Sequence, residues 1–161
     1  MVKVLIKKLY PEVKLPSYKT SGASGMDLMA FVKSTIIIKP KTSCLIPTGL
    51  SLAFSKDYEV QIRPRSGLAA KNNISVLNTP GTIDSDYRGE IKVIIYNHGN
   101  QNFIINNNDR IAQMILTPVI KMELQETNEL PETIRGESGF GSTGKWAKIS
   151  IKKKLKNFLD N

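Results

Sequence analysis

The chain has 161 residues, of which 40% are hydrophobic and 7% aromatic, and its formal net charge is +9. This length allows one domain with a real buried core, and the composition is that of an ordinary soluble protein. Cys44 is the single cysteine, which excludes a disulfide framework and favours a reducing compartment; we expect its side chain to be buried. No segment has the length and apolarity of a signal peptide or a membrane span, so the sequence predicts a cytoplasmic protein without membrane attachment.

The positive charge is concentrated at one end of the chain. Six lysines and one acidic residue follow residue 144, so more than half of the net charge of +9 comes from this basic tail. The rest of the chain is mildly basic, which argues against stable nucleic-acid binding and is compatible with attraction of a small polyanion. The tail, residues 145–161, is predicted to be disordered or a short amphipathic helix, and its role stays open.

Short runs of β-branched residues separated by proline, glycine and asparagine predict a chain of strands. In chain order they cover residues 2–9, 28–32, 35–38, 44–52, 59–62, 90–97, 103–105 and 110–119. Ile91, Val93 and Ile95 recur at every second position, the period of a strand with one buried face. The one helical candidate in this part of the chain, 66–71, is short, and Ser66 is placed to cap it. The pattern predicts an all-β barrel or sandwich.

The densest group of candidate functional residues is the stretch Asn-Thr-Pro-Gly-Thr-Ile-Asp-Ser-Asp-Tyr-Arg-Gly-Glu at 78–90. Pro80 and Gly81 predict a chain reversal, with Gly81 at the positive φ that such turns need. Unpaired backbone groups at the tip could read the edge of a flat polar ligand. Asp84 could accept a proton from water, and Tyr87 could wall off one side of a pocket. Taken alone, the stretch is more typical of a surface turn, and the functional interpretation depends on the other motifs of the chain.

Two further stretches are suited to binding an anion. Residues 64–69, Pro-Arg-Ser-Gly-Leu-Ala, offer the Arg65 guanidinium, the Ser66 hydroxyl and the backbone N–H groups of a helix start. Residues 108–113, Asn-Asp-Arg-Ile-Ala-Gln, add an amide donor and a second cation, Arg110. Guanidinium groups suit phosphate or carboxylate, so structural ion pairs are the alternative for these arginines.

From about residue 125 the sequence becomes polar and then rich in glycine, which is typical of a mobile arm. Between Arg135 and Gly144 the arm offers a guanidinium, glycine N–H groups, hydroxyls and Phe140, which could stack on a base. Gly139 to Lys145 has the spacing of a phosphate-binding loop, but Trp146 replaces the metal-binding hydroxyl and no apolar strand precedes it, so we reject that motif. We therefore expect a barrel domain at 1–124, an arm at 125–144 and the basic tail.

Five segments, in this order, resemble the five motifs of trimeric dUTP pyrophosphatases (dUTPases). They are Ser-Gly-Met-Asp-Leu at 24–28, Arg-Ser-Gly-Leu-Ala at 65–69, Gly-Thr-Ile-Asp-Ser-Asp-Tyr-Arg-Gly at 81–89, Asp-Arg-Ile-Ala-Gln at 109–113 and the run 135–144. The resemblance implies a jelly-roll-like β-barrel with one short helix and a flexible C-terminal arm. It also implies a homotrimer in which the arm of one subunit closes over a site built by the other two.

The same resemblance implies hydrolysis of dUTP to dUMP and pyrophosphate with Mg²⁺, which supplies the precursor of dTMP and keeps uracil out of DNA. In this comparison Asp84 corresponds to the general base that activates water for attack on the α-phosphorus. The segment that reads uracil corresponds to Asn78, Gly81, Thr82 and Ile83. Tyr87 corresponds to the ring that packs on deoxyribose and leaves no room for a 2′-hydroxyl.

The remaining correspondences concern phosphate and metal. Phosphate contacts correspond to Arg65, Ser66, Gly67 and Gln113. The γ-phosphate and base-stacking contacts of the arm correspond to Arg135, Phe140, Gly141, Ser142 and Thr143. Asp27 resembles a position near the water shell of magnesium, and Lys92 is expected to face either the site or the solvent.

Two departures and two rival functions stay open. Asn108 and Ser138 stand where glycines are usual in the family, which affects one turn and the flexibility of the arm. A dCTP deaminase on the same fold, alone or with dUTPase activity, would need a glutamate deep in the pocket, where this hairpin offers Asn78 and backbone. A non-catalytic nucleotide-binding module would have no need of a base such as Asp84.

Overall fold

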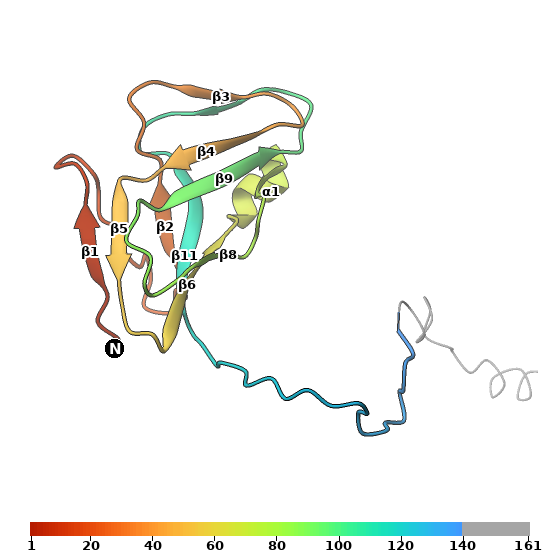
Figure 1. Ribbon diagram of the computed structural model, residues 1–161. Helices are drawn as coiled ribbons and strands as arrows, with labels where there is room; N and C mark the ends of the chain where they lie inside the picture. Colours follow the sequence, from red (N-terminus) through yellow and green to blue (C-terminus); the bar gives the residue numbers. More distant parts are fainter. Residues whose placement is uncertain (140–161) are drawn as a thin grey trace, which may run out of the picture. The chain divides into compact units, whose positions relative to one another are not determined.

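The computed structural model describes residues 1–139, and these comprise eleven strands and one helix (Figure 1). Residue contacts divide the chain into two units, Met1–Met122 and Glu123–Asn161, and all these elements lie in the first. The elements are β1 (Leu5–Lys8), β2 (Met26–Met29), β3 (Ile36–Ile38), β4 (Ser43–Pro47), β5 (Leu50–Ala53), β6 (Tyr58–Arg63), α1 (Ser66–Asn72), β7 (Ile74–Val76), β8 (Gly81–Ile83), β9 (Lys92–Asn97), β10 (Phe103–Ile105) and β11 (Arg110–Pro118). The helix is too short to cross a membrane.

The strands form four small antiparallel sheets. The largest has the order β2-β11-β6-β8, the next has the order β4-β9-β7, and the pairs β1-β5 and β3-β10 complete the set. Within the described residues no strand pairs with its immediate neighbour in the chain. Such long-range antiparallel pairing is a feature of jelly-roll topologies. The predicted all-β, jelly-roll-like fold with one short helix is confirmed.

The core lies between the inward faces of the strands. On β9 the side chains of Val93 and Ile95 are each 1% exposed, whereas Lys92 is exposed, so the alternation predicted for this segment is confirmed. Two buried polar side chains are fully engaged. Thr48 donates to the backbone oxygen of Ile91 at 2.6 Å, and Asn97 donates to two backbone oxygens at 2.8 and 3.0 Å. The core therefore carries no polar cost at these positions.

The strands differ from the predicted pattern at residues 44–52 and at β7 and β8. The run predicted at 44–52 is broken into β4 and β5 at Gly49, whose φ of 69° ends a strand. Conversely, β7 and β8 lie outside the predicted strands; each has only three residues and is held by one longer partner. Gly81 lies in β8 with extended backbone, so its predicted positive φ is wrong; the reversal precedes it, at a cis Thr79–Pro80 bond.

Three local expectations also need correction or comment. Ser66 is the first helical residue of α1, and Arg65 occupies the N-cap position without a side-chain cap, so Ser66 does not cap the helix. The Cys44 side chain is half-buried on β4 rather than fully buried. Asn108 has φ of 69°, a conformation that asparagine tolerates better than most residues, which explains how it replaces a glycine there.

Gly49 provides a test of the fold. A Cβ at this position would clash with Val13 Cγ2, and the positive φ is itself unfavourable for alanine. Gly49→Ala should therefore lower the free energy of unfolding by about 1–3 kcal/mol. Gly22→Ala is the control, because its Cβ would meet no atom within 4 Å; it should change stability by no more than about 0.5 kcal/mol. Urea unfolding at one fixed protein concentration measures both, and equal stability of the two variants would contradict the close packing at Gly49.

Candidate functional site

A pocket of about 460 Å³ lies where β8 and the loop after it meet β4 and β9. Its lining residues are Leu45, Asn78, Thr82, Ile83, Asp84, Tyr87, Glu90, Lys92 and Ile94. Sheet pairing positions them: β8 is held against β6 with Gly81 opposite Ile62, and β4 pairs with β9 so that Leu45 stands opposite Ile94. Six of the predicted site residues therefore meet in one cavity, among them Lys92, whose orientation the sequence left open.

The close approach of Asn78 to β8 depends on the absence of a side chain at Gly81. This residue is buried, and a Cβ on it would lie 3.1 Å from the side-chain nitrogen of Asn78. The glycine thus lets the Asn78 amide approach the backbone of β8 closely. Because β8 is the last strand in the order β2-β11-β6-β8, it is an edge strand, and one row of its backbone groups pairs with no other strand of residues 1–139 and could bind a ligand.

Tyr87 is fixed in place by its own short loop. Its hydroxyl donates to the backbone oxygen of Glu90 at 3.1 Å, and its backbone N–H donates to the oxygen of Asp84 at 3.1 Å. The ring lies against Gly89, where any Cβ would clash with the phenol. At 45% exposure the ring still presents a face to the pocket. The loop therefore holds a rigid aromatic wall three residues after Asp84.

The charged groups of the pocket have different surroundings. The Glu90 carboxylate accepts the Gly49 N–H at 2.8 Å and lies 3.8 Å from the Lys92 ammonium. The Asp84 side chain is exposed and has no hydrogen-bond or ion-pair partner among residues 1–139. Asp84 is thus the pocket carboxylate that can take a proton from water, because Glu90 is already committed to other groups.

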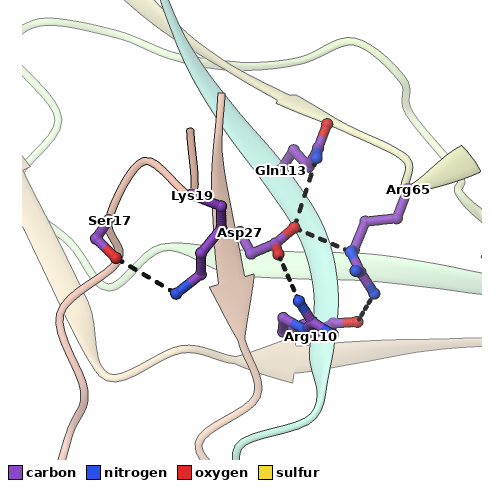
Figure 2. Close-up of polar contacts among 6 residues, drawn as sticks. All are labelled: Ser17, Lys19, Asp27, Arg65, Arg110 and Gln113. Atoms are coloured by element: carbon purple, nitrogen blue, oxygen red, sulfur yellow. Dashed lines mark hydrogen bonds and ion pairs between the residues drawn. The ribbon is translucent and has the colours of Figure 1, made fainter. Parts of the chain in front are cut away.

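A second polar cluster surrounds Asp27 on β2 (Figure 2). Its carboxylate accepts the Arg65 Nε–H at 2.9 Å on Oδ1 and an Arg110 Nη1–H at 3.3 Å on Oδ2. Arg65 Nη1 also donates to the backbone oxygen of Arg110 at 3.1 Å, and the Gln113 amide nitrogen lies 3.5 Å from Oδ1. The pairing of β11 with β2 places Gln113 opposite Asp27. Two predicted phosphate contacts, Arg65 and Gln113, therefore gather around the predicted metal-shell residue.

The remaining predicted residues lie outside both groups. Ser66 and Gly67 are exposed at the start of α1, and a Cβ on Gly67 would meet no atom within 4 Å. In the second unit, Arg135 donates from Nε to the Ser138 oxygen at 2.8 Å within its own turn. The other predicted arm contacts, Phe140, Gly141, Ser142 and Thr143, lie outside the described residues. No residue of the Asp27 cluster lines the β8 pocket.

Sequence reasoning missed three residues that line the pocket and the ion pairs of the Asp27 cluster. Leu45, Glu90 and Ile94 line the pocket, and Arg110 was recognised as a cation without its partner Asp27. Leu45 and Ile94 look like ordinary strand residues in the sequence, so only the β4–β9 register reveals them. Glu90 is the last residue of the stretch 78–90, and its position beside Asp84 and Tyr87 in the sequence could have identified it as a candidate pocket residue.

The described residues do not by themselves form a magnesium site. No group of three or more His, Cys, Asp or Glu side chains among residues 1–139 could hold a metal ion. Both oxygens of the Asp27 carboxylate are engaged by arginines. Mg²⁺ commonly keeps several waters and binds through one or two carboxylates together with substrate phosphates. The donor set here therefore lacks the carboxylates of a protein-made site.

Comparison with known proteins identifies the family. The family description dUTPase matches residues 11–144. The chain belongs to the dUTPase family. The deoxyuridine 5′-triphosphate nucleotidohydrolase of Fusobacterium nucleatum is 51% identical over 146 residues, which cover 90% of this chain and 100% of that protein. The protein of the same name from Nautilia profundicola is 55% identical over 144 residues, 89% of this chain and 100% of that protein.

Solved dUTPase structures share the fold. The dUTPase of Staphylococcus bacteriophage 80alpha with dUPNHPP superimposes with a TM-score of 0.79 and covers 88% of this chain and 98% of that chain, at 23% identity. A mutant dUTPase of phage phi11 of S. aureus, described for the coordination of a structural Mg(II) ion, has a TM-score of 0.72 at 19% identity, with coverages of 81% and 99%. At these identities the likeness concerns the dUTPase fold alone.

Proposed function

We propose that the chain hydrolyses dUTP to dUMP and pyrophosphate, supplying the precursor of dTMP and keeping uracil out of DNA. The observation that carries this proposal is the β8 pocket, in which the edge strand β8, the hydrogen-bonded Tyr87 and Asp84, which has no side-chain partner among residues 1–139, line one cavity. Two relatives with 51% and 55% sequence identity are named deoxyuridine 5′-triphosphate nucleotidohydrolases, which supports the same substrate for this chain.

The edge of β8 would select the base. Uracil presents alternating acceptors and a donor, and those backbone groups of Gly81, Thr82 and Ile83 that face away from β6, with the Asn78 amide, can pair with that pattern. Cytosine presents a donor where uracil has an acceptor, so fixed backbone groups would leave it with an unsatisfied contact. A 5-methyl group would have to fit beside a strand whose approach to Asn78 is already close.

Asp84 would act on the attacking water. Its carboxylate takes a proton as the water oxygen bonds to the α-phosphorus, and the bond to the bridging oxygen breaks to release pyrophosphate. Lys92, Arg65, Ser66, Gly67 and Gln113 are proposed to contact the phosphates. Mg²⁺ bound together with the triphosphate would supply positive charge to the leaving group, and residues 1–139 offer no carboxylate set that would hold it alone.

We also propose that the enzyme is a cytoplasmic homotrimer with sites shared between subunits. This proposal is supported by the separation of the β8 pocket from the Asp27 cluster, because no residue of the cluster lines the pocket. A second copy could present its arginines to the pocket of the first. The barrel at 1–124 would be followed by an arm at 125–144, whose residues Arg135, Phe140, Gly141, Ser142 and Thr143 close over a neighbouring site.

The deaminase alternative is less well supported by this pocket. Deamination needs an acid–base group at the exocyclic nitrogen, and the glutamate available is Glu90. That carboxylate already accepts the Gly49 N–H and faces Lys92. It is therefore poorly placed to shuttle protons to a base.

The direct test is a substrate panel. The protein is incubated with magnesium and each of dUTP, dCTP, dTTP and UTP, and pyrophosphate and ammonia are assayed separately. We expect pyrophosphate from dUTP far above the other three, and no ammonia. Ammonia from dCTP would establish the deaminase, and binding of dUTP without either product would establish a non-catalytic module.

Asp84→Asn should lower turnover of dUTP by about 10²–10⁴-fold, because the amide keeps the shape of the side chain and cannot take the proton. Binding of a slow-reacting dUTP analogue should be largely retained, as measured by calorimetry. A variant that keeps more than about a tenth of the activity would lie outside the range for a lost general base and would remove Asp84 from this role.

The same variant tests the shared site. A protein truncated after Leu130 keeps every described strand and should fold, yet lose activity with its arm. In mixed trimers an Asp84→Asn subunit would lend its arm to a site whose Asp84 comes from a truncated subunit. Activity of verified mixed trimers should exceed that of either parent, whereas no recovery would mean that the arm serves its own subunit.

Tyr87 should determine the preference for deoxyribose over ribose. Tyr87→Ala removes the ring, and Gly89→Ala displaces it through the clash with the phenol, so both should let UTP compete better with dUTP. Tyr87→Phe keeps the ring but loses the hydrogen bond to Glu90, and its effect should be smaller. Tyr18→Ala, an exposed tyrosine outside the pocket, is the control. An unchanged dUTP-to-UTP ratio of kcat/KM in both Tyr87→Ala and Gly89→Ala would refute the steric role.

A further inference from the structure

We propose that Asp27 is a positioning residue that holds the guanidinium groups of Arg65 and Arg110 as one phosphate-binding pair, and that it does not belong to the water shell of the metal. The inference rests on the proposed function, because the pair is taken to receive the phosphates of dUTP. It also adds Arg110 to the phosphate contacts expected from the sequence.

Both oxygens of the Asp27 carboxylate already accept a hydrogen bond from a guanidinium group. Oδ1 accepts the Arg65 Nε–H at 2.9 Å and Oδ2 accepts the Arg110 Nη1–H at 3.3 Å (Figure 2). The Asp27 side chain is 9% exposed. A hydrated cation brought to this carboxylate would also face two guanidinium charges at short range, which repel it. The local charge therefore favours an anion over a metal ion.

The same contacts fix the direction of the Arg65 guanidinium. Nε is bound to Asp27 and Nη1 to the backbone oxygen of Arg110 at 3.1 Å, so two points of a planar group are held. Nη2 has no hydrogen-bond partner within residues 1–139 and is free to donate. A donor fixed in advance loses less conformational entropy when an anion binds than a freely rotating side chain does.

Exposure increases from the carboxylate outward. The side chains of Asp27, Arg65 and Arg110 are 9%, 23% and 53% exposed. The negative group thus lies beneath the two positive groups, and the charge that reaches the surface is positive. Two guanidiniums and one carboxylate leave an excess positive charge, which suits a polyphosphate.

The fold explains why this pair depends on Asp27. Arg65 comes from the N-cap position of α1 and Arg110 from the start of β11, elements far apart in the sequence. The β2–β11 pairing places Arg110 opposite Met29, two residues from Asp27. Like-charged guanidiniums repel each other, so the shared carboxylate is what allows both to point to one place.

The test compares Asp27→Asn with a matched control, Asp57→Asn. The control removes the same charge from an exposed carboxylate in the β5–β6 turn that, among residues 1–139, accepts a hydrogen bond from Ser55 alone. Affinities for inorganic triphosphate and for deoxyuridine are measured by calorimetry, and kcat and KM for dUTP are measured over a magnesium titration. Thermal unfolding of each variant monitors the fold.

We expect Asp27→Asn to weaken inorganic triphosphate binding by about 10-fold or more, the usual scale for loss of a supporting side chain. Deoxyuridine affinity and the magnesium concentration for half-maximal activity should be unchanged, and Asp57→Asn should match the parent protein. The effect of Asp27→Asn should be smaller in an Arg65→Gln background, because the positioned group is already gone.

Three outcomes would overturn the proposal. Parallel loss of triphosphate and deoxyuridine binding with a lower unfolding temperature would make Asp27 a purely structural residue. Recovery of activity at high magnesium would return it to the metal's water shell, and unchanged triphosphate binding would remove it from the site. Absence of dUTP hydrolysis by the parent protein would instead refute the proposed function. The affinity for inorganic triphosphate would still test whether Asp27 positions the two arginines.

Arg110→Gln provides a second variant if Asp27→Asn does not fold. It leaves the Asp27–Arg65 ion pair in place and removes the second guanidinium. Triphosphate affinity should fall while deoxyuridine affinity is kept. Unchanged triphosphate affinity would exclude Arg110 from the pair and overturn that part of the proposal.

Discussion

The β8 pocket depends on the hydrogen bond between the Gly49 backbone and the Glu90 side chain. The Glu90 carboxylate accepts the Gly49 N–H at 2.8 Å, and the next residue, Ile91, donates its N–H to the Leu50 oxygen at 2.8 Å. Glu90 also receives the Tyr87 hydroxyl on its backbone oxygen. The corner between β4 and β5 is thereby tied to the loop that carries Asp84 and the aromatic wall. Ile91, fully buried, anchors that loop in the core.

The chain uses its carboxylates in opposite ways according to their surroundings. Asp84 is exposed and unpaired among the described residues, so it is available to a water molecule. Asp27 is buried beneath two arginines, and Glu90 is committed to a backbone N–H and a lysine. A carboxylate whose oxygens already accept hydrogen bonds from protein groups has fewer free lone pairs to offer a water molecule. The difference in environment supports assigning the role of base to Asp84.

Both groups of proposed ligand residues draw on strands that are distant in the sequence. The β8 pocket needs β4, β8 and β9, and the Asp27 cluster needs β2, β11 and the start of α1. Neither group exists until the antiparallel pairings form, so folding and site formation are coupled in each case. The short strand β8, with only three residues, is held by β6 and would have little stability alone.

The sequence by itself determined the strand period at Ile91, Val93 and Ile95, the short helix and the ordered motifs that identify the dUTPase family, because these are properties of local runs. It also placed Asp84 and Tyr87 close together, since they are three residues apart. Only the tertiary structure decided that Leu45 on β4 stands opposite Ile94 on the paired strand β9. It also decided that Asp27 pairs with Arg65 and Arg110, and that the backbone of Gly81 is extended. The reason is that strand register and ion pairing depend on partners dozens of residues away, and no local pattern records which partner a strand or a carboxylate will meet.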